Sequence, residues 1–173
     1  MIHNRNPSAA LVSAVTTSDQ FDTSQWNSIC DLTLTLKQAR KADNGVWIRI
    51  DEAQCRKAVA VFMHRLDRAV YGHAASRFGK RIKVLPILER AQLGRWHIHA
   101  AIELPAHISP TRFDELIRQC WSKVDWADDR IFFRDNANRG WIDYMLKPWQ
   151  KSGFETWLDC IVWECLHNPI VGA

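Results

Sequence analysis

The sequence lacks both a C-x-x-C cysteine pair and an apolar run long enough to cross a bilayer. Its five cysteines are an odd number scattered along the chain, at Cys30, Cys55, Cys120, Cys160 and Cys165. This spacing indicates neither a disulfide framework nor a zinc ribbon, and a reducing cytoplasm fits it best. The apolar stretches at 9–15 and around 161 are short or interrupted by polar residues, so we expect no membrane segment.

Internal repeats and low-complexity tracts are also absent, and the composition is that of an ordinary globular protein. The chain has 173 residues, of which 47% are hydrophobic and 24% charged, which argues against a disordered, collagen-like or membrane-embedded chain. This length predicts one compact domain. The net charge of +4 permits a polyanionic partner without requiring one. Nine tryptophans can either fill a core or offer flat faces to nucleic-acid bases.

The chain divides into an N-terminal arm and a single folded domain. Residues 1–27 are rich in small and polar residues without a sustained period, which predicts a flexible arm, so we place the domain at 28–173. Its first strand is the run 30–37, where leucines alternate with threonines as in a half-buried strand. A linker at 43–45 follows, and an amphipathic helix starts near Asp51.

The remaining sequence predicts a hairpin followed by alternating helices and strands. Two strands, at 82–89 and 96–104, are joined by a short turn that contains Gly94. After them the sequence predicts a helix that starts at Ser109 and Pro110, a strand at 130–134, a helix at 139–147 ended by Pro148, and a final apolar helix at 154–166. The order βαββαβα predicts an α+β fold. We expect a ferredoxin-like or RRM-like antiparallel sheet, with helices packed mainly on one face and an extra C-terminal helix.

Two histidines share one face of the second hairpin strand. Apolar side chains alternate with His97 and His99, so both imidazoles point away from the core and can converge on one ion. If the hairpin loop has three residues with Gly94 in the left-handed conformation, Glu89 lies directly across from His97. Glu103 is about 13 Å further along the strand than His99. Glu89, His97 and His99 are therefore the expected ligands of a divalent ion that binds a phosphate oxygen; chance surface histidines are the alternative.

A tyrosine and a lysine share an exposed edge of the helix at 139–147. Tyr144 and Lys147 lie away from the apolar side of this helix. A cation one turn away would favour the phenolate form of a tyrosine or stabilise a phosphodiester adduct formed on the tyrosine. Such a pair also arises by chance about one time in twenty, so it carries weight only together with other features.

Three motifs together resemble those of the HUH endonucleases, and in particular of single-tyrosine rolling-circle replication initiators. They are the first-strand T-L-T motif within 30–37, the metal-binding motif of Glu89 with His97-Ile98-His99, and the tyrosine motif Tyr144-x-x-Lys147. The motifs occur in the family's order and span roughly residues 29–148. Their joint match is far more specific than any one of them.

The resemblance implies a metal-dependent, sequence-specific nicking and strand-transfer enzyme that initiates rolling-circle replication. Tyr144 would attack a DNA phosphodiester, leaving a 5′-phosphotyrosyl link and a free 3′-hydroxyl. Mg²⁺ or Mn²⁺ would be bound by His97, His99 and Glu89. Lys147 would assist the tyrosine and the metal.

The chain departs from this family pattern in two respects. The tyrosine helix has one tyrosine rather than a Y-x-x-x-Y pair, so a second strand transfer needs another active site or a water. No G-x-x-x-x-G-K-[ST] sequence occurs, so we expect no helicase domain. The expected partners are single-stranded or hairpin origin DNA and a host or replicon helicase acting in trans.

We expect DNA contacts from the first-strand motif and from a basic cluster, although such clusters are usually just solvated surface. The expected DNA-binding residues are Thr33, Thr35, Lys37, Lys80, Arg81, Lys83 and Arg95. Trp47 and Trp126 are the expected platforms for base stacking, since the other tryptophans of the motifs point inward.

Three other functions have to be weighed against this one. A related transposase or relaxase would use the same chemistry, but relaxases carry their tyrosine near the N-terminus and such transposases usually have glutamine in place of Lys147. A non-catalytic origin-binding protein or repressor could keep the fold, yet it would not need Tyr144, His97 and His99. A two-histidine phosphoesterase would need a second histidine motif, which the remaining histidines do not supply.

Overall fold

The structure, a computed structural model, describes residues 21–91, 94–138, 140–146, 153–156 and 158–166. Four strands form one sheet: β1 (Ile29–Leu36), β4 (Val84–Arg90), β5 (Trp96–Glu103) and β6 (Ala127–Arg134). Their order is β4-β5-β1-β6, and every neighbouring pair is antiparallel. The helices are α1 (Glu52–Tyr71), α2 (His73–Arg77), α3 (Pro110–Trp121) and α4 (Gly140–Leu146). The predicted α+β class with an antiparallel sheet is confirmed.

The β4–β5 hairpin has the register that the sequence predicted. Glu89 pairs with His97 across the two strands. Gly94 has a φ of +73°, the left-handed conformation that glycine adopts without strain. The backbone amide of Ala91 donates to the carbonyl of Arg95 at 2.9 Å and closes the loop. A one-residue slip would have turned Glu89 to the opposite face, so this register positions the carboxylate.

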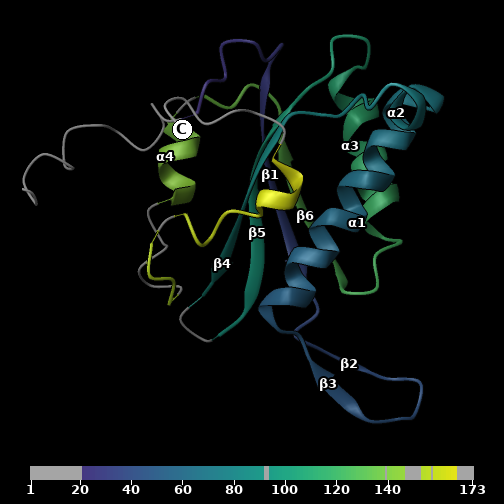
Figure 1. The fold of residues 1–173 in the computed structure, drawn as a ribbon, viewed down its shortest axis with the longest axis vertical. Helices are drawn as coiled ribbons and strands as arrows, with labels where there is room; N and C mark the ends of the chain where they lie inside the picture. Colours follow the sequence, from purple (N-terminus) through teal and green to yellow (C-terminus); the bar gives the residue numbers. More distant parts are fainter. Residues whose placement is uncertain (1–20, 92–93, 139, 147–152, 157, 167–173) are drawn as a thin grey trace, which may run out of the picture.

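Helices α1 and α3 cover one face of the sheet (Figure 1). The side chain of Asp51 caps α1 by accepting from a backbone amide of the first turn, and Ser109 caps α3 with Pro110 directly behind it. The rings of Phe62 on α1 and Trp121 on α3 meet edge to face with centroids 5.5 Å apart, a contact worth about 1 kcal/mol beyond its buried area. Both helices start where the sequence predicted.

The second face of the sheet is covered as well, but mostly by irregular segments: α1 and α3 pack on the first face and the short helix α4 on the second, which agrees with the prediction of helices mainly on one face. Helix α4, the segment before β1, and Cys160 and Ile161 pack there (Figure 1), whereas Val162 and Cys165 belong to the core beneath α1. Residues 84–88 of β4 are all buried. A strand that is apolar on both sides needs a cover on each face, and this explains the second layer.

Residues 21–27 belong to the folded domain, which corrects the predicted boundary of the N-terminal arm. Phe21 is 2% and Trp26 8% exposed, and the backbone amide of Asn27 donates to Glu103 at 3.0 Å. Burial of two large rings outweighs the polar composition of this segment. The rest of the predicted arm, residues 1–20, lies outside the described residues.

The final helix predicted at 154–166 is wrong in the part of the chain that the structure describes. Ile161 forms an antiparallel bridge with Ile87 of β4, and the amide of Leu88 donates to the carbonyl of Cys160 at 2.8 Å. A single 3₁₀ turn, η4 (Trp163–Cys165), follows. The segment pairs with the open edge of β4, whose backbone groups a helix could not satisfy.

The linker predicted at 43–45 is the turn of a second hairpin. β2 (Ala39–Lys41) pairs with β3 (Trp47–Arg49) in antiparallel fashion. This hairpin projects beyond the end of the main sheet (Figure 1). Strands of three residues are too short to show an alternation pattern, so the sequence carries no clear signal for them.

Within the described residues, none of the helices has the length and apolar character needed to cross a bilayer. The five cysteines are buried and none is joined in a disulfide, as the sequence predicted. Burial raises the pKa of Cys30, Cys55, Cys160 and Cys165 to about 12. These thiols are therefore protonated at neutral pH and unsuited to nucleophilic chemistry.

Candidate active site

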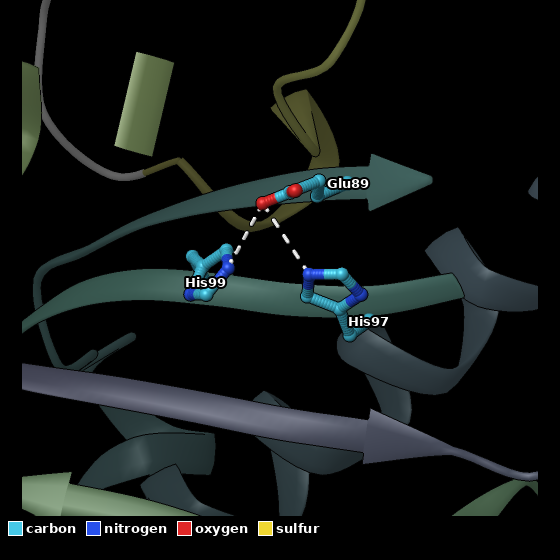
Figure 2. Close-up of side chains that lie close together, drawn as sticks. All are labelled: Glu89, His97 and His99. Carbon is cyan, nitrogen blue, oxygen red and sulfur yellow. Dashed lines mark ion pairs between the residues drawn. The ribbon is translucent and has the colours of Figure 1, made fainter. Parts of the chain in front are cut away.

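A carboxylate and two imidazoles converge on the β4–β5 pair (Figure 2). Glu89 Oε2 lies 3.0 Å from His99 Nε2 and 3.3 Å from His97 Nε2. Glu89 and His97 are cross-strand partners, and His99 is on the same face two residues on. Between 13 and 21% of each side chain is exposed. The cluster is therefore held in place by the sheet and remains open to a ligand.

The geometry of this cluster fits a divalent cation. The candidate ligand atoms of Glu89, His97 and His99 all lie within 4.8 Å of one another. Two ligands about 2.1 Å from one ion and about 90 to 110° apart are separated by about 3.0 to 3.4 Å, and the two Nε2–Oε2 distances fall in this range. Two imidazoles and a carboxylate leave further coordination positions open to a substrate oxygen. These three residues can therefore hold such an ion.

The carboxylate of the cluster is ionised at neutral pH. Hydrogen bonds from His97 and His99 lower the pKa of Glu89 to about 2, although partial burial acts in the opposite direction. A metal ligand has to be deprotonated. Glu89 therefore meets this requirement throughout the physiological range.

His99 is held from its other ring nitrogen by Thr33 of β1. Thr33 is the cross-strand partner of His99, and its Oγ1 lies 2.9 Å from Nδ1. A hydroxyl both donates and accepts, so Thr33 can donate to Nδ1 when Nε2 carries the proton and accept from Nδ1 when Nε2 binds an ion. The first-strand motif thus orients a candidate metal ligand, a role that the sequence shows only once the β1–β5 register is known.

The second threonine of the motif faces β6 instead. The Thr35 hydroxyl donates to the carbonyl of Arg130 at 2.7 Å and lies 3.2 Å from Asp128 Oδ1. Both threonine hydroxyls are engaged within the protein, whereas Lys37 at the end of the strand is exposed. The expectation that Thr33, Thr35 and Lys37 contact DNA stays a prediction.

A tryptophan links Tyr144 to the histidines. Helix α4 lies over the face of the sheet that carries the cluster (Figure 1). The Trp141 ring meets His99 edge-on at a centroid distance of 5.6 Å, and its Nε1 donates to the carbonyl of Ala100 at 3.2 Å. Tyr144 stacks on Trp141 with centroids 5.3 Å apart and planes 22° apart. Tyr144 is 57% exposed, so its phenol is accessible on the same face as the cluster.

An open hollow of about 560 Å³ lies beside Tyr144. Its lining consists of Arg134, Asn136, Ala137, Asn138, Gly140, Trp141 and Tyr144. The guanidinium of Arg134 is held by Asp31 of β1, whose Oδ2 is 3.0 Å away and whose side chain is 2% exposed. Burial raises the pKa of Asp31, and Arg134 opposes this shift. The hollow therefore offers a fixed cation and two amides to a ligand at the tyrosine.

Three of the predicted DNA-binding residues lie just before β4, namely Lys80, Arg81 and Lys83. Glu89 is near the other end of that strand, about 20 Å from Lys83 at 3.3 Å per residue. Lys83 also forms an ion pair with Glu103 at 3.1 Å. The structure thus does not bring these three residues to the cluster, and it keeps Glu103 away from the histidines as the sequence predicted.

The remaining predicted residues have different surroundings. Arg95 is exposed at the start of β5, and Trp47 on β3 is 69% exposed, as a base-stacking platform requires. Trp126 is 6% exposed and lies under Arg40, whose guanidinium is 4.9 Å from its ring centroid. The prediction of Trp126 as a platform is therefore wrong. Lys147 lies outside the described residues, and its role stays a prediction.

Comparisons of the chain with protein-family models, with curated proteins and with solved structures found no match. The chemistry of the site has to be inferred from its own geometry. That geometry combines three candidate metal ligands, an accessible tyrosine and an adjoining hollow on one face of the sheet.

Proposed function

We propose that this protein is a metal-dependent, single-stranded DNA endonuclease of the HUH type that initiates rolling-circle replication through a phosphotyrosine link at Tyr144. One observation carries the proposal: the cluster of Glu89, His97 and His99 shares a sheet face with an exposed tyrosine, and Trp141 contacts both. A metal ligand set without a nucleophile, or a tyrosine remote from it, would not support this reaction.

The sheet supports the proposal at the level of the fold. Along the chain the main-sheet strands follow one another as β1, β4, β5 and β6, with α1 between β1 and β4 and α3 between β5 and β6. Across the sheet their order is β4-β5-β1-β6, so the second, third, first and fourth strands of the chain lie side by side in that order. A ferredoxin-like β-α-β-β-α-β unit has this order, and we propose that arrangement here. Its two central strands, β1 and β5, carry Thr33, His97 and His99.

The proposed reaction is a transesterification. The Tyr144 oxygen forms a bond to phosphorus while the bond from phosphorus to the 3′ oxygen breaks. The phenol proton is lost to solvent, and the 3′ oxygen takes up a proton to leave as a hydroxyl. The 5′ phosphate stays on the tyrosine and preserves the energy of the phosphodiester for a later transfer. Mg²⁺ or Mn²⁺ bound by Glu89, His97 and His99 would polarise a non-bridging phosphate oxygen.

The surrounding side chains supply orientation. Stacking on Trp141 restricts the ring of Tyr144, which reduces the entropy lost on reaching the reactive geometry. Thr33 fixes the ring of His99 from behind. Arg134, held by Asp31, is a fixed cation that can pair with a phosphate next to the scissile one.

A covalent-adduct assay with a single-stranded DNA library tests this proposal. The library carries a randomised stretch, so that no knowledge of the origin is needed, and the reaction contains Mn²⁺. We expect the wild-type protein to give an adduct that survives a denaturing gel and whose DNA can be sequenced. Tyr144→Phe should give none, while Tyr71→Phe, the matched control at the only other tyrosine, should react normally.

The same assay separates an enzyme from a binding protein. A repressor or origin-binding protein would retain library molecules in a native gel and form no covalent adduct with any sequence. That result, or full adduct formation by Tyr144→Phe, would contradict the proposed function.

A further inference from the structure

The β2–β3 hairpin is anchored to the body of the protein through one of its faces. Arg40 points inward over the ring of Trp126 at 4.9 Å, and Ile48 packs against the main core. These two residues are cross-strand partners. Because side chains alternate along a strand, their neighbours point outward, and the outer face of the hairpin is held in a fixed orientation.

The root of the hairpin is tied to the strand that carries the histidines. The Gln38 side chain accepts from the backbone amide of Trp96 at 2.7 Å and donates to its carbonyl at 2.9 Å. Trp96 directly precedes His97, whose cross-strand partner on β1 is Thr35. The hairpin therefore leaves the sheet at the end where the candidate metal cluster lies, and it projects beyond the sheet below the start of α1 (Figure 1).

The outer face of the hairpin presents two cations around a large exposed ring. Lys41 pairs with Trp47, and Arg49 pairs with Ala39, and all four side chains are exposed. Trp47 is 69% and Val46, in the turn, 56% exposed. An exposed indole between cations matches the way proteins contact nucleic acids, through phosphate pairing combined with ring contacts to sugars and bases.

We propose that this outer face binds the double-stranded DNA that flanks the nick site, an inference that rests on the proposed function. A two-stranded ribbon fits the major groove of B-DNA, which is about 12 Å wide. Lys41 and Arg49 would pair with phosphates on its edges, and Trp47 would contact the groove. Lys37 at the root of the hairpin adds a third exposed cation, and the turn contributes one exposed acidic residue, Asp43.

The length of the hairpin sets the position of the duplex. The chain from Thr35 to Lys41 spans at most about 22 Å, and about six base pairs cover that distance. The duplex should therefore begin within about six nucleotides of the phosphate at the metal cluster. DNA in this region would be single-stranded at Tyr144 and paired on the hairpin.

Duplex binding tests the inference without requiring cleavage. The probe is a fluorescein-labelled DNA duplex, and anisotropy gives its dissociation constant over a range of salt concentrations. The variant Lys41→Ala/Arg49→Ala should bind more weakly, and its slope of log Kd against log salt should be smaller by about two. The control Arg112→Ala/Arg118→Ala loses the same charge on α3 and should bind like the wild type.

Trp47→Ala gives a second, independent measurement on the same face. It should weaken duplex binding about tenfold, through lost ring contacts, and leave the salt slope unchanged. Wild-type affinity and slope in Lys41→Ala/Arg49→Ala, together with wild-type affinity in Trp47→Ala, would overturn the inference.

Cleavage connects the hairpin to the nick site. We expect the wild type to cut a selected site faster when a duplex begins within about six nucleotides than when all flanking DNA is single-stranded. Lys41→Ala/Arg49→Ala should lose this preference and cut the single-stranded substrate normally. If the variant keeps the preference, the hairpin inference fails alone. If the wild type forms no adduct at all, the proposed function fails, and duplex binding still decides whether the hairpin is a DNA-binding surface.

Discussion

Thr33 on β1 and His99 on β5 are direct cross-strand partners, with 2.9 Å between Thr33 Oγ1 and His99 Nδ1. The other nitrogen of the same ring faces Glu89 at 3.0 Å. The imidazole is therefore fixed between a hydroxyl and a carboxylate, which leaves Nε2 as the atom that can bind an ion. Thr35, two residues along the same strand, bonds to β6 instead, so β1 provides a matched pair of threonines.

Thr33→Val should weaken Mn²⁺ binding about tenfold or more, because outer contacts of this kind orient a metal-ligating histidine. Thr35→Val removes the same hydroxyl from the same strand and should leave Mn²⁺ affinity unchanged. Isothermal titration calorimetry measures both dissociation constants. Equal weakening in the two variants would mean that loss of either threonine acts through the stability of β1 rather than through His99.

Glu89→Gln should weaken Mn²⁺ binding, since a neutral amide is a poorer ligand than a carboxylate. The effect should be larger than that of the same substitution at another glutamate of the sheet. Excess Mn²⁺ should partly restore adduct formation. Glu103→Gln is the matched control on the same sheet face, where Glu103 pairs with Lys83; it should bind Mn²⁺ normally even if it melts earlier. Weak binding in the Glu103 variant and normal binding in the Glu89 variant would contradict the assigned ligands.

Trp141→Leu should slow formation of the covalent adduct about tenfold or more, because it removes the ring that holds Tyr144. Mn²⁺ affinity should change much less than this rate, since the three candidate ligands are retained. Single-turnover kinetics at saturating Mn²⁺ measure the rate. Trp163→Leu, at an exposed tryptophan of η4, is the control and should react at the wild-type rate. An unchanged rate in Trp141→Leu would rule out a positioning role.

Asp67 should make the stability of the fold depend on pH. It accepts from the backbone amide of Ile82 at 2.8 Å, and burial raises its pKa from the ordinary 3.8 to about 6, although Arg81 opposes the shift. The folded protein thus binds this proton more tightly than the unfolded chain. The resulting stabilisation is complete below about pH 4 and is lost as the pH rises through about 6.

Asp67→Asn cannot titrate and should remove this contribution. The free energy of unfolding of the wild type, relative to that of the variant, should fall by up to about 3 kcal/mol between pH 4 and pH 7. Urea unfolding at a series of pH values measures the difference. A difference that is constant with pH would show that Asp67 titrates near its ordinary value.

The cluster of Glu89, His97 and His99 could be predicted because all its determinants are local. Alternation of apolar residues places both histidines on one face, and a glycine suited to the left-handed conformation fixes the loop and hence the cross-strand partner of His97. The start of α1 and of α3 follows from capping residues, which are local as well.

The parts that could not be predicted depend on contacts between distant segments. Thr33 and His99 are 66 positions apart, and only the register of the whole sheet shows that they meet. Trp26 packs on the second face as a single large side chain, and Ile161 reaches this face through one β-bridge to Ile87. Neither contact produces a periodic pattern in the sequence. The contact of Trp141 with His99 likewise appears only when α4 is packed on the sheet.

The most direct test of the central claim is to find the amino acid that carries the DNA. Trypsin cuts after Arg139 and Lys151, while Pro148 protects the bond after Lys147, so the peptide 140–151 contains Tyr144 as its single tyrosine. The adduct formed with the single-stranded library is digested with nuclease and trypsin and analysed by mass spectrometry. The account predicts a phosphate and nucleotide remnant on Tyr144 in this peptide. A remnant on the peptide that contains Tyr71, or on a serine or cysteine, would contradict it.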